Sequence, residues 1–155
     1  MGAVASAKGL CRVMLPHYTM EDLKAMLAFE HPGAREDGAK FSELAELTRA
    51  HFNGSSVSFD SVACDLPAEA SFSGRVLRAC RQIPCGQTLT YTQLAMKIGQ
   101  EQAARAVATA MSKNRTPLVI PCHRVVGADG KLHGFSAPGG IPLKKRMLEL
   151  EKAAR

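Results

Sequence analysis

The chain contains no tryptophan, an absence that bears on packing more than on chemistry. No apolar stretch is long enough to span a membrane. The five cysteines show no paired spacing and no signal peptide precedes them, so we expect a reduced, intracellular compartment rather than a disulfide framework. Internal repeats and low-complexity tracts are also lacking. Together these absences favour a soluble globular chain.

The chain does have the length for one ordinary domain or two small lobes, with 155 residues. Lysine and arginine number 20 against 14 acidic residues, which gives a net charge of +6. This balance favours an anionic partner, although a mild basic excess is also common in proteins that bind none.

Residues 1–66 are predicted to form a small N-terminal α+β lobe that serves as a scaffold. Thr19, with Asp22 three residues on, is typical of a helix N-cap, and Asn53-Gly54 is typical of a helix stop. The expected elements are an irregular start at residues 1–9, a strand at 10–15, a helix from Thr19, a helix at 41–52 and a strand at 57–64.

Residues 67–155 are predicted to form a mostly helical second lobe. Its first helix carries an apolar stripe made of Val76, Leu77, Cys80 and Ile83. Thr90 and Gln93 fit a capping box that opens a short helix, and Gly99 closes it. A second helix at residues 101–112 follows a tight turn, which gives the pair helix-turn-helix character.

The second helix of this pair has two different faces at about 100° per residue. One face gathers Ala103, Ala106, Val107, Ala110 and Met111, and the opposite face carries Arg105, Ala108, Thr109 and Ser112. A solvated face normally carries Glu, Lys or Gln, whereas this one is small and nearly uncharged apart from Arg105. Small side chains let a helix approach another surface closely, and an arginine can reach into a groove. The alternative is that alanine is simply the best helix former.

The segment Pro121-Cys122-His123-Arg124-Val125-Val126 carries the candidate chemistry. The apolar run 118–120 before it predicts a short buried strand or extended segment that delivers the cysteine to a fixed position. A thiol must ionise to act as a nucleophile, and a nearby imidazole can take its proton, with or without a bridging water. A direct contact between Cys122 and His123 needs a turn or helix start, because neighbours on an extended segment point opposite ways. The alternative is a buried, inert cysteine.

This hexapeptide resembles the active-site signature of the O6-alkylguanine-DNA alkyltransferases, also called methylated-DNA–protein-cysteine methyltransferases. The flanking matches, in the family's order, are Tyr91-Thr92-Gln93-Leu94-Ala95, Ala103-Ala104-Arg105-Ala106-Val107, Asn114 and Gly134-Phe135-Ser136. The resemblance covers residues 72–151. It implies a DNA repair protein that flips an O6-alkylguanine out of double-stranded DNA and transfers the alkyl group irreversibly to Cys122, once per molecule and without a cofactor.

The resemblance also implies a role for each matching residue. The catalytic set is Cys122 as nucleophile, His123 as base through a water, Glu151 as the residue that orients His123, Asn114 as a hinge, and Tyr91 as proton donor to the leaving guanine. The DNA-binding set is Tyr91, Ala104, Arg105, Thr109 and Ser112, with Arg105 holding the gap left by the flipped nucleotide. The substrate-binding set is the backbone near Val125 and Ser136, with Met111 and Pro117 as apolar walls.

Several of these residues have an ordinary interpretation as well. Tyr91 at a helix start more often just packs its ring, and Asn114 is typical of a helix end. The last helix, from about residue 142, is predicted to bury Leu143, Met147 and Leu150 and to direct Lys144, Lys145 and Arg146 elsewhere. Glu151 then lies at the edge of the buried face, where a surface glutamate is the ordinary expectation.

No metal is predicted, because Cys11, His17, His31 and Cys64 do not reproduce the zinc ligands that some family members hold in the N-terminal lobe. We expect a monomer whose partner is DNA, with no membrane partner, in the cytoplasm or, for a eukaryotic source, the nucleus. The alternative function is non-catalytic recognition of alkylation damage, but such relatives lack the reactive cysteine. A cysteine hydrolase would need an oxyanion hole, and no motif in the sequence indicates one.

Overall fold

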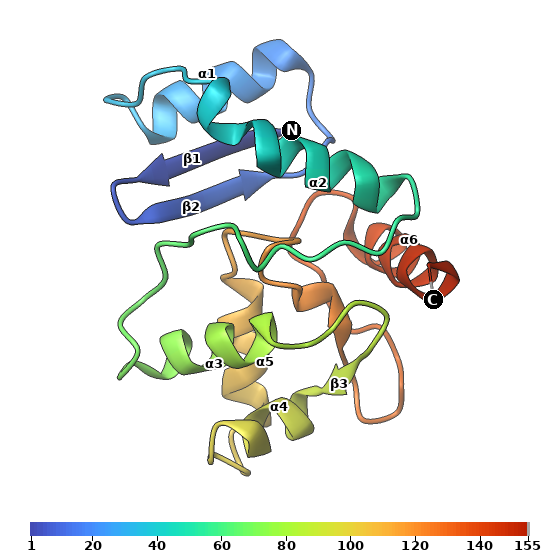
Figure 1. The fold of residues 1–155 in the computed structure, drawn as a ribbon. Helices are drawn as coiled ribbons and strands as arrows, with labels where there is room; N and C mark the ends of the chain where they lie inside the picture. Colours follow the sequence, from blue (N-terminus) through green and yellow to red (C-terminus); the bar gives the residue numbers. More distant parts are fainter. Residues whose placement is uncertain (155) are drawn as a thin grey trace.

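The computed structural model describes residues 1–154, which form two lobes (Figure 1). The N-terminal lobe contains β1 (Gly2–Ser6), β2 (Gly9–Met14), α1 (Met20–Glu30), the 3-10 helix η1 (Ala39–Phe41) and α2 (Ser42–Phe52). The C-terminal half contains α3 (Phe72–Arg81), β3 (Leu89–Thr90), α4 (Tyr91–Lys97), α5 (Ala104–Ser112), the 3-10 helix η2 (Cys122–Arg124), β4 (Val125–Val126) and α6 (Gly140–Ala153). The predicted α+β class is confirmed.

The N-terminal lobe begins with an antiparallel hairpin, in which Gly2 pairs with Met14. The strand expected at 10–15 is confirmed as β2, whereas the irregular start expected at 1–9 is wrong. The small residues of β1 give a weak strand signal, and β1 forms because β2 supplies hydrogen-bond partners for its backbone. Helix α1 begins after its predicted N-cap, since the Asp22 N–H donates to the Thr19 hydroxyl at 3.1 Å.

The strand expected at residues 57–64 does not form. A turn interrupts it, closed by the Val62 N–H donating to the Phe59 carbonyl at 3.1 Å. The Arg81 guanidinium occupies three carbonyls of the same segment at 2.7–3.2 Å. These carbonyls are therefore not available as acceptors for a neighbouring strand. The segment makes only an isolated bridge to β2, through Cys64.

Helices α4 and α5 form the predicted helix-turn-helix. The capping box is present, with the Gln93 N–H donating to Thr90 Oγ1 at 3.1 Å and the Thr90 N–H donating to the Gln93 side chain at 2.7 Å. Helix α5 starts at Ala104 rather than near residue 101, because the turn continues until the Ala103 N–H donates to the Gln100 carbonyl at 2.8 Å.

The two faces of α5 differ in burial much as expected. Val107, Ala110 and Met111 are buried, and Arg105 is exposed. Ala106 is also exposed, against the expectation that it faces inward, since the neighbouring helices α3 and α4 cover only part of α5.

Two hydrophobic cores hold the molecule together. One lies within the C-terminal lobe around Val76, Leu94 and Val107. The other belongs mainly to the N-terminal lobe but includes Val119 and Met147 from the C-terminal half. Helix α6 contacts both α2 and η2, and it lies where the lobes meet (Figure 1). Segments distant in sequence are thereby brought together beside the cysteine segment.

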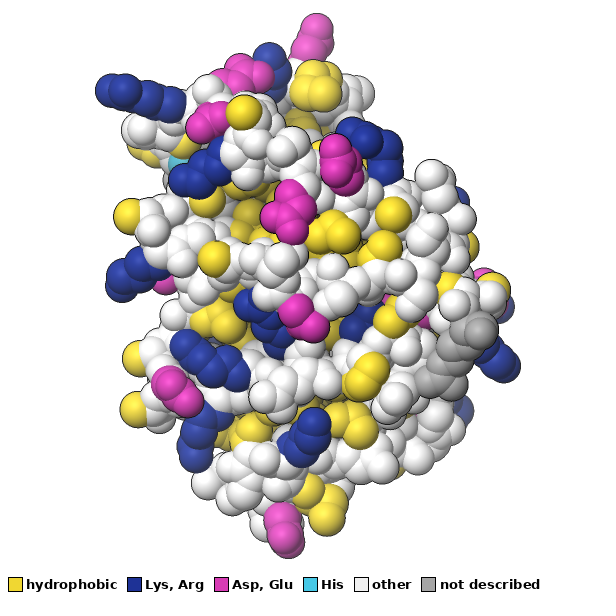
Figure 2. All heavy atoms as spheres, viewed as in Figure 1, with side chains coloured by type: hydrophobic (Ala, Val, Ile, Leu, Met, Phe, Trp, Pro, Cys, Tyr) yellow, Lys and Arg dark blue, Asp and Glu magenta, His cyan; other side chains and the backbone are white. Residues whose placement is uncertain are grey.

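The surface is mixed in charge on the face drawn in Figure 2, with lysine and arginine side chains spread among acidic ones on both lobes. None of the described helices combines the length and the apolar character that crossing a membrane requires.

Candidate active site and nucleic-acid interface

Cys122 is delivered by a tight turn, not by the extended segment expected at 118–120. Leu118 is buried and has a positive φ of 74°, and Pro117 and Ile120 form a bridge across the turn. The Cys122 N–H donates to the Ile120 carbonyl at 2.8 Å, and η2 then begins at Cys122 itself. The helix start that a Cys–His pairing requires is therefore present.

Cys122 lines a pocket of about 650 Å³. Six of the predicted site residues line it besides the cysteine, namely Tyr91, Ala104, Arg105, Met111, Ser112 and Ser136. The pocket thus joins the outer face of α5, the start of α4 and the glycine-rich loop at residues 134–140. Thr109 lies on the same exposed side of α5, where its hydroxyl donates to the Arg105 carbonyl at 3.1 Å, but it does not line the pocket.

A second, interlobe hollow of about 450 Å³ also reaches Cys122. Asn114 and Pro117 line this hollow rather than the first pocket. The Asn114 side chain donates to the Ile120 carbonyl at 2.9 Å and accepts from the Thr116 N–H at 3.0 Å, so it braces the turn that leads to the cysteine.

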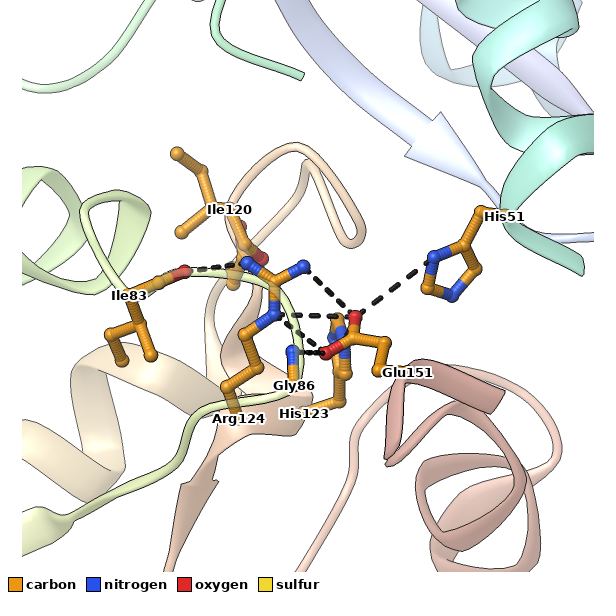
Figure 3. Close-up of polar contacts among 8 residues, drawn as sticks. His51, Ile83, Gly86, Ile120, His123, Arg124 and Glu151 are labelled. Atoms are coloured by element: carbon orange, nitrogen blue, oxygen red, sulfur yellow. Dashed lines mark hydrogen bonds and ion pairs between the residues drawn. The ribbon is translucent and has the colours of Figure 1, made fainter. Parts of the chain in front are cut away.

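The buried side of the site is a relay of His123 and Glu151, with Arg124 beside them (Figure 3). His123 Nε2 lies 2.7 Å from Glu151 Oε1, and both side chains are almost completely buried. A carboxylate can only accept, so Nε2 carries the proton and Nδ1 has the lone pair. Nδ1 has no protein hydrogen-bond partner among residues 1–154. The Nδ1 lone pair of His123 is therefore available to accept a proton.

Arg124 holds the carboxylate from another direction and was missed by the sequence reasoning. Its Nε and Nη2 donate to Glu151 at 2.9 Å each, and the Gly86 N–H donates to Glu151 Oε2 at 3.0 Å. The arginine stood inside the recognised hexapeptide, but nothing in the sequence linked it to a glutamate on the last helix. With the His123 Nε2–H, these donors give both oxygens of the buried Glu151 carboxylate hydrogen-bond partners.

The electrostatics of the relay follow from burial and pairing. Burial raises the pKa of Glu151, but the hydrogen bonds from His123 and Arg124 outweigh it and hold this pKa well below its usual range. Burial lowers the pKa of His123, and the Glu151 carboxylate partly offsets that effect. At neutral pH the pair is therefore an ionised carboxylate and a neutral imidazole.

The Cys122 thiol experiences opposing influences. Burial raises its pKa, while the hydrogen bond from the Asn114 side chain and the positive charge of Lys144 lower it. Thiolate formation at this cysteine therefore depends on groups that stabilise a buried anion.

Lys144 is the largest departure from the sequence expectation. Instead of lying on the polar side of α6, it is completely buried, and its Nζ donates to the carbonyls of Val125 at 2.6 Å and His133 at 3.2 Å. Among the described residues no carboxylate pairs with it. Lys144 and Glu151 are seven residues apart, so they lie on the same face of α6. This spacing could have indicated from the sequence that Lys144 is buried with Glu151.

Of the backbone near Val125, which is predicted to bind the base, the Val125 carbonyl itself accepts a hydrogen bond from that lysine. Val125 itself is fully buried and does not line the pocket. Tyr91 lies 6.0 Å from Lys144 Nζ, measured to the ring centroid, and is half-buried. Burial, followed by the proximity of Cys122, raises the pKa of Tyr91, so its hydroxyl stays protonated.

One cluster with metal-ligand character occurs among residues 1–154, made of His51, His123 and Glu151 with ligand atoms within 4.8 Å of one another. The guanidinium of Arg124 binds the same carboxylate, and its positive charge opposes a cation there. The expectation of no metal stays a prediction.

Comparisons with known proteins agree with this geometry. Residues 71–153 match the family described as 6-O-methylguanine DNA methyltransferase, DNA binding domain. A methylated-DNA–protein-cysteine methyltransferase of Methanosarcina barkeri is 37% identical over 134 residues, covering 86% of this chain and 82% of the relative. One from Mycobacterium bovis is 43% identical over 117 residues, covering 76% of this chain and 68% of the relative.

Solved structures give the same result for the whole fold. The crystal structure of Mycobacterium tuberculosis OGT in complex with DNA superposes with a TM-score of 0.79 at 33% identity, covering 98% of this chain and 86% of the other. The O6-methylguanine-DNA methyltransferase of Pyrococcus kodakaraensis gives a TM-score of 0.60 at 27% identity, with 85% and 76% covered. The chain therefore belongs to the 6-O-methylguanine DNA methyltransferase family.

Proposed function

We propose that this protein repairs double-stranded DNA by transferring the alkyl group of O6-alkylguanine irreversibly to its own Cys122. Family membership supports the reaction class. The observation that carries the assignment to this cysteine is its position, since it lines an open pocket and the His123–Glu151 relay begins at the next residue. An inert structural cysteine would need neither.

DNA engagement is assigned to the outer face of α5. Its small residues Ala104 and Ser112 let the helix approach the minor groove, and Arg105 holds the gap left by a flipped nucleotide. Thr109, on the same exposed side of α5, is assigned to contact the DNA backbone. The net charge of +6 favours the encounter with a polyanion.

The chemical step begins with proton transfer from the Cys122 thiol to His123 Nδ1 through a water, with Glu151 orienting the imidazole. Lys144 stabilises the thiolate. The sulfur attacks the alkyl carbon in line, so that an S–C bond forms as the C–O6 bond breaks. Guanine leaves with a proton from the Tyr91 hydroxyl, which neutralises its developing negative charge.

Binding of the lesion base is assigned to backbone groups near Ser136 and near Val125, where Gly127 and Ala128 line the pocket, with Met111 as an apolar wall. Pro117 is assigned as a second apolar wall from the interlobe hollow, which also reaches Cys122. Asn114 acts as the hinge that holds the cysteine turn. The thioether product has no group to remove it, so each molecule acts once, and the reaction needs no cofactor. The proposed location is the cytoplasm, or the nucleus in a eukaryote. The protein is proposed to be a monomer, and the boundary between its two lobes is assigned near residue 66.

The test is the intact mass of the protein after incubation with a duplex that carries O6-methylguanine, alongside Cys122→Ala. We expect a gain of one methyl group, mapped to Cys122 and absent in the variant. Tight binding without a mass gain would instead indicate a lesion-recognition protein, and the absence of both would contradict the proposed function.

A further inference from the structure

His51 is a buried polar residue that the mechanism above does not use. It lies one residue before the end of α2, in the N-terminal lobe, and is 1% exposed. Both of its ring nitrogens are buried and have no hydrogen-bond partner among the described residues. Unpaired buried polar atoms are costly, so such a side chain calls for a reason.

The surroundings of His51 are aromatic on one side and ionic on the other. Its ring lies edge-on to Phe52, with centroids 5.3 Å apart, and 6.0 Å from the ring of His123. Its Nδ1 faces Glu151 Oε1 at 3.9 Å, and Figure 3 shows the imidazole directed at the carboxylate from the opposite lobe. His51 thus approaches the Oε1 atom of Glu151 from the N-terminal lobe, beside the donors that His123 and Arg124 supply to the same atom.

The charge and tautomer of His51 follow from this environment. Burial, then the proximity of His123, lowers the pKa of His51 to about 4, so the ring is neutral at working pH. A neutral imidazole has one N–H and one lone pair, and a carboxylate repels the lone pair. The proton of His51 is therefore favoured on Nδ1.

We propose that His51 is a positioning residue for the alkyl transfer, which as its Nδ1–H tautomer holds Glu151 in the conformation that orients His123. This inference rests on the proposed function. The separation of 3.9 Å exceeds a hydrogen bond, but contacts of catalytic groups commonly tighten when substrate binds. The N-terminal lobe then contributes to the chemistry as well as to the scaffold.

Three substitutions at position 51 distinguish the role of the Nδ1–H donor from the role of the aromatic ring. His51→Asn keeps an N–H at the position of Nδ1, because its amide nitrogen is the same number of bonds from Cβ. His51→Gln moves the N–H to the position of Nε2, and His51→Phe keeps an aromatic ring without a donor. The matched control is His17→Phe, since His17 is exposed in the same lobe.

The measurement is the single-turnover transfer rate with saturating O6-methylguanine duplex, with duplex affinity measured in parallel. We expect His51→Phe and His51→Gln to slow transfer about tenfold, since small displacements of a catalytic group cost this much or more. His51→Asn should stay within about threefold of the wild type, as should the control. Transfer by His51→Phe at the wild-type rate, or equal losses in Asn and Gln, would overturn the proposal.

A second readout needs neither DNA nor substitution at position 51. In protein labelled with 15N at histidine, the ring-nitrogen shifts report which nitrogen carries the proton. We expect His51 to be the Nδ1–H tautomer in the wild type and to change towards Nε2–H in Glu151→Gln. An Nε2–H tautomer in the wild type would contradict the inference. If the wild type fails to transfer, the proposed function fails, and this readout still tests the His51–Glu151 pairing.

Discussion

The two sides of Cys122 are built differently. The pocket side is formed by neighbouring elements of one lobe, α4, α5 and the glycine-rich loop, and several of its side chains are exposed or half-buried. The relay side is formed by His123, Arg124 and Glu151, all buried, from segments far apart in the sequence. We infer that the pocket side selects the substrate, whereas the relay side sets the protonation states for the reaction.

The relay side should show the largest effect on chemistry. In Glu151→Gln the amide can donate to His123 Nε2, which places the imidazole proton on Nδ1 and removes the base. We expect the single-turnover transfer rate to fall about 10³-fold, by analogy with other His–carboxylate pairs, with lesion binding largely retained. Glu149→Gln, exposed on the same helix, is the control. A loss below about fivefold would show that Glu151 does not fix the tautomer.

Acid should destabilise the relay side through His51. The folded pKa of His51, about 4, lies below its ordinary 6.5, so its contribution to stability is complete above pH 6.5 and is lost as pH falls towards 4. This amounts to about 3 kcal/mol in the free energy of unfolding. Between pH 7 and pH 4, the free energy of unfolding measured in urea should fall by about 3 kcal/mol less in His51→Phe than in the wild type. Equal drops in both proteins would contradict a neutral buried His51.

Lys144 links the two sides, and its removal should have an intermediate effect. Loss of a buried positive charge raises the pKa of the Cys122 thiol further. In Lys144→Met we expect about tenfold slower transfer at neutral pH, corresponding to about one pKa unit, with recovery at alkaline pH. The pH dependence of iodoacetamide labelling at Cys122 provides the same information without DNA. Lys145→Met is the control, and a rate deficit independent of pH would argue for a structural role instead.

A single side-chain truncation on the pocket side should have the smallest effect, and this effect should be on DNA binding. Arg105→Ala removes one long side chain from an exposed helix face, and we expect about fivefold weaker binding to the lesion duplex, roughly 1 kcal/mol. Reaction of Cys122 with iodoacetamide should not change, because the relay is intact. Arg146→Ala, exposed on α6, controls for charge. Equal affinity of Arg105→Ala and the wild type would remove Arg105 from the interface.

Much of the pocket side was predictable from the sequence. The capping box at Thr90, the helix-turn-helix and the exposed position of Arg105 depend on neighbours a few residues apart, which periodicity and capping rules describe. Errors there were local, such as the start of α5. The strand expected at 57–64 failed because a distant residue, Arg81, binds its carbonyls.

The relay side was predictable only in part. The resemblance indicated that Glu151 orients His123, and the 2.7 Å contact fits this expectation, although the roles themselves stay predictions. Arg124 and His51 were not anticipated, and Lys144 was placed on the wrong face of its helix. Each of these three depends on a partner from a distant segment.

The sequence by itself determined the class of protein, the two-lobed α+β organisation and the cysteine segment, because local periodicity and short motifs encode them. Only the tertiary structure decided which charges are buried together: Arg124 on Glu151, His51 facing the same carboxylate from the other lobe, and Lys144 against the Val125 carbonyl. The physical reason is that burial of a charge depends on what the rest of the chain packs against it, and this information is not local.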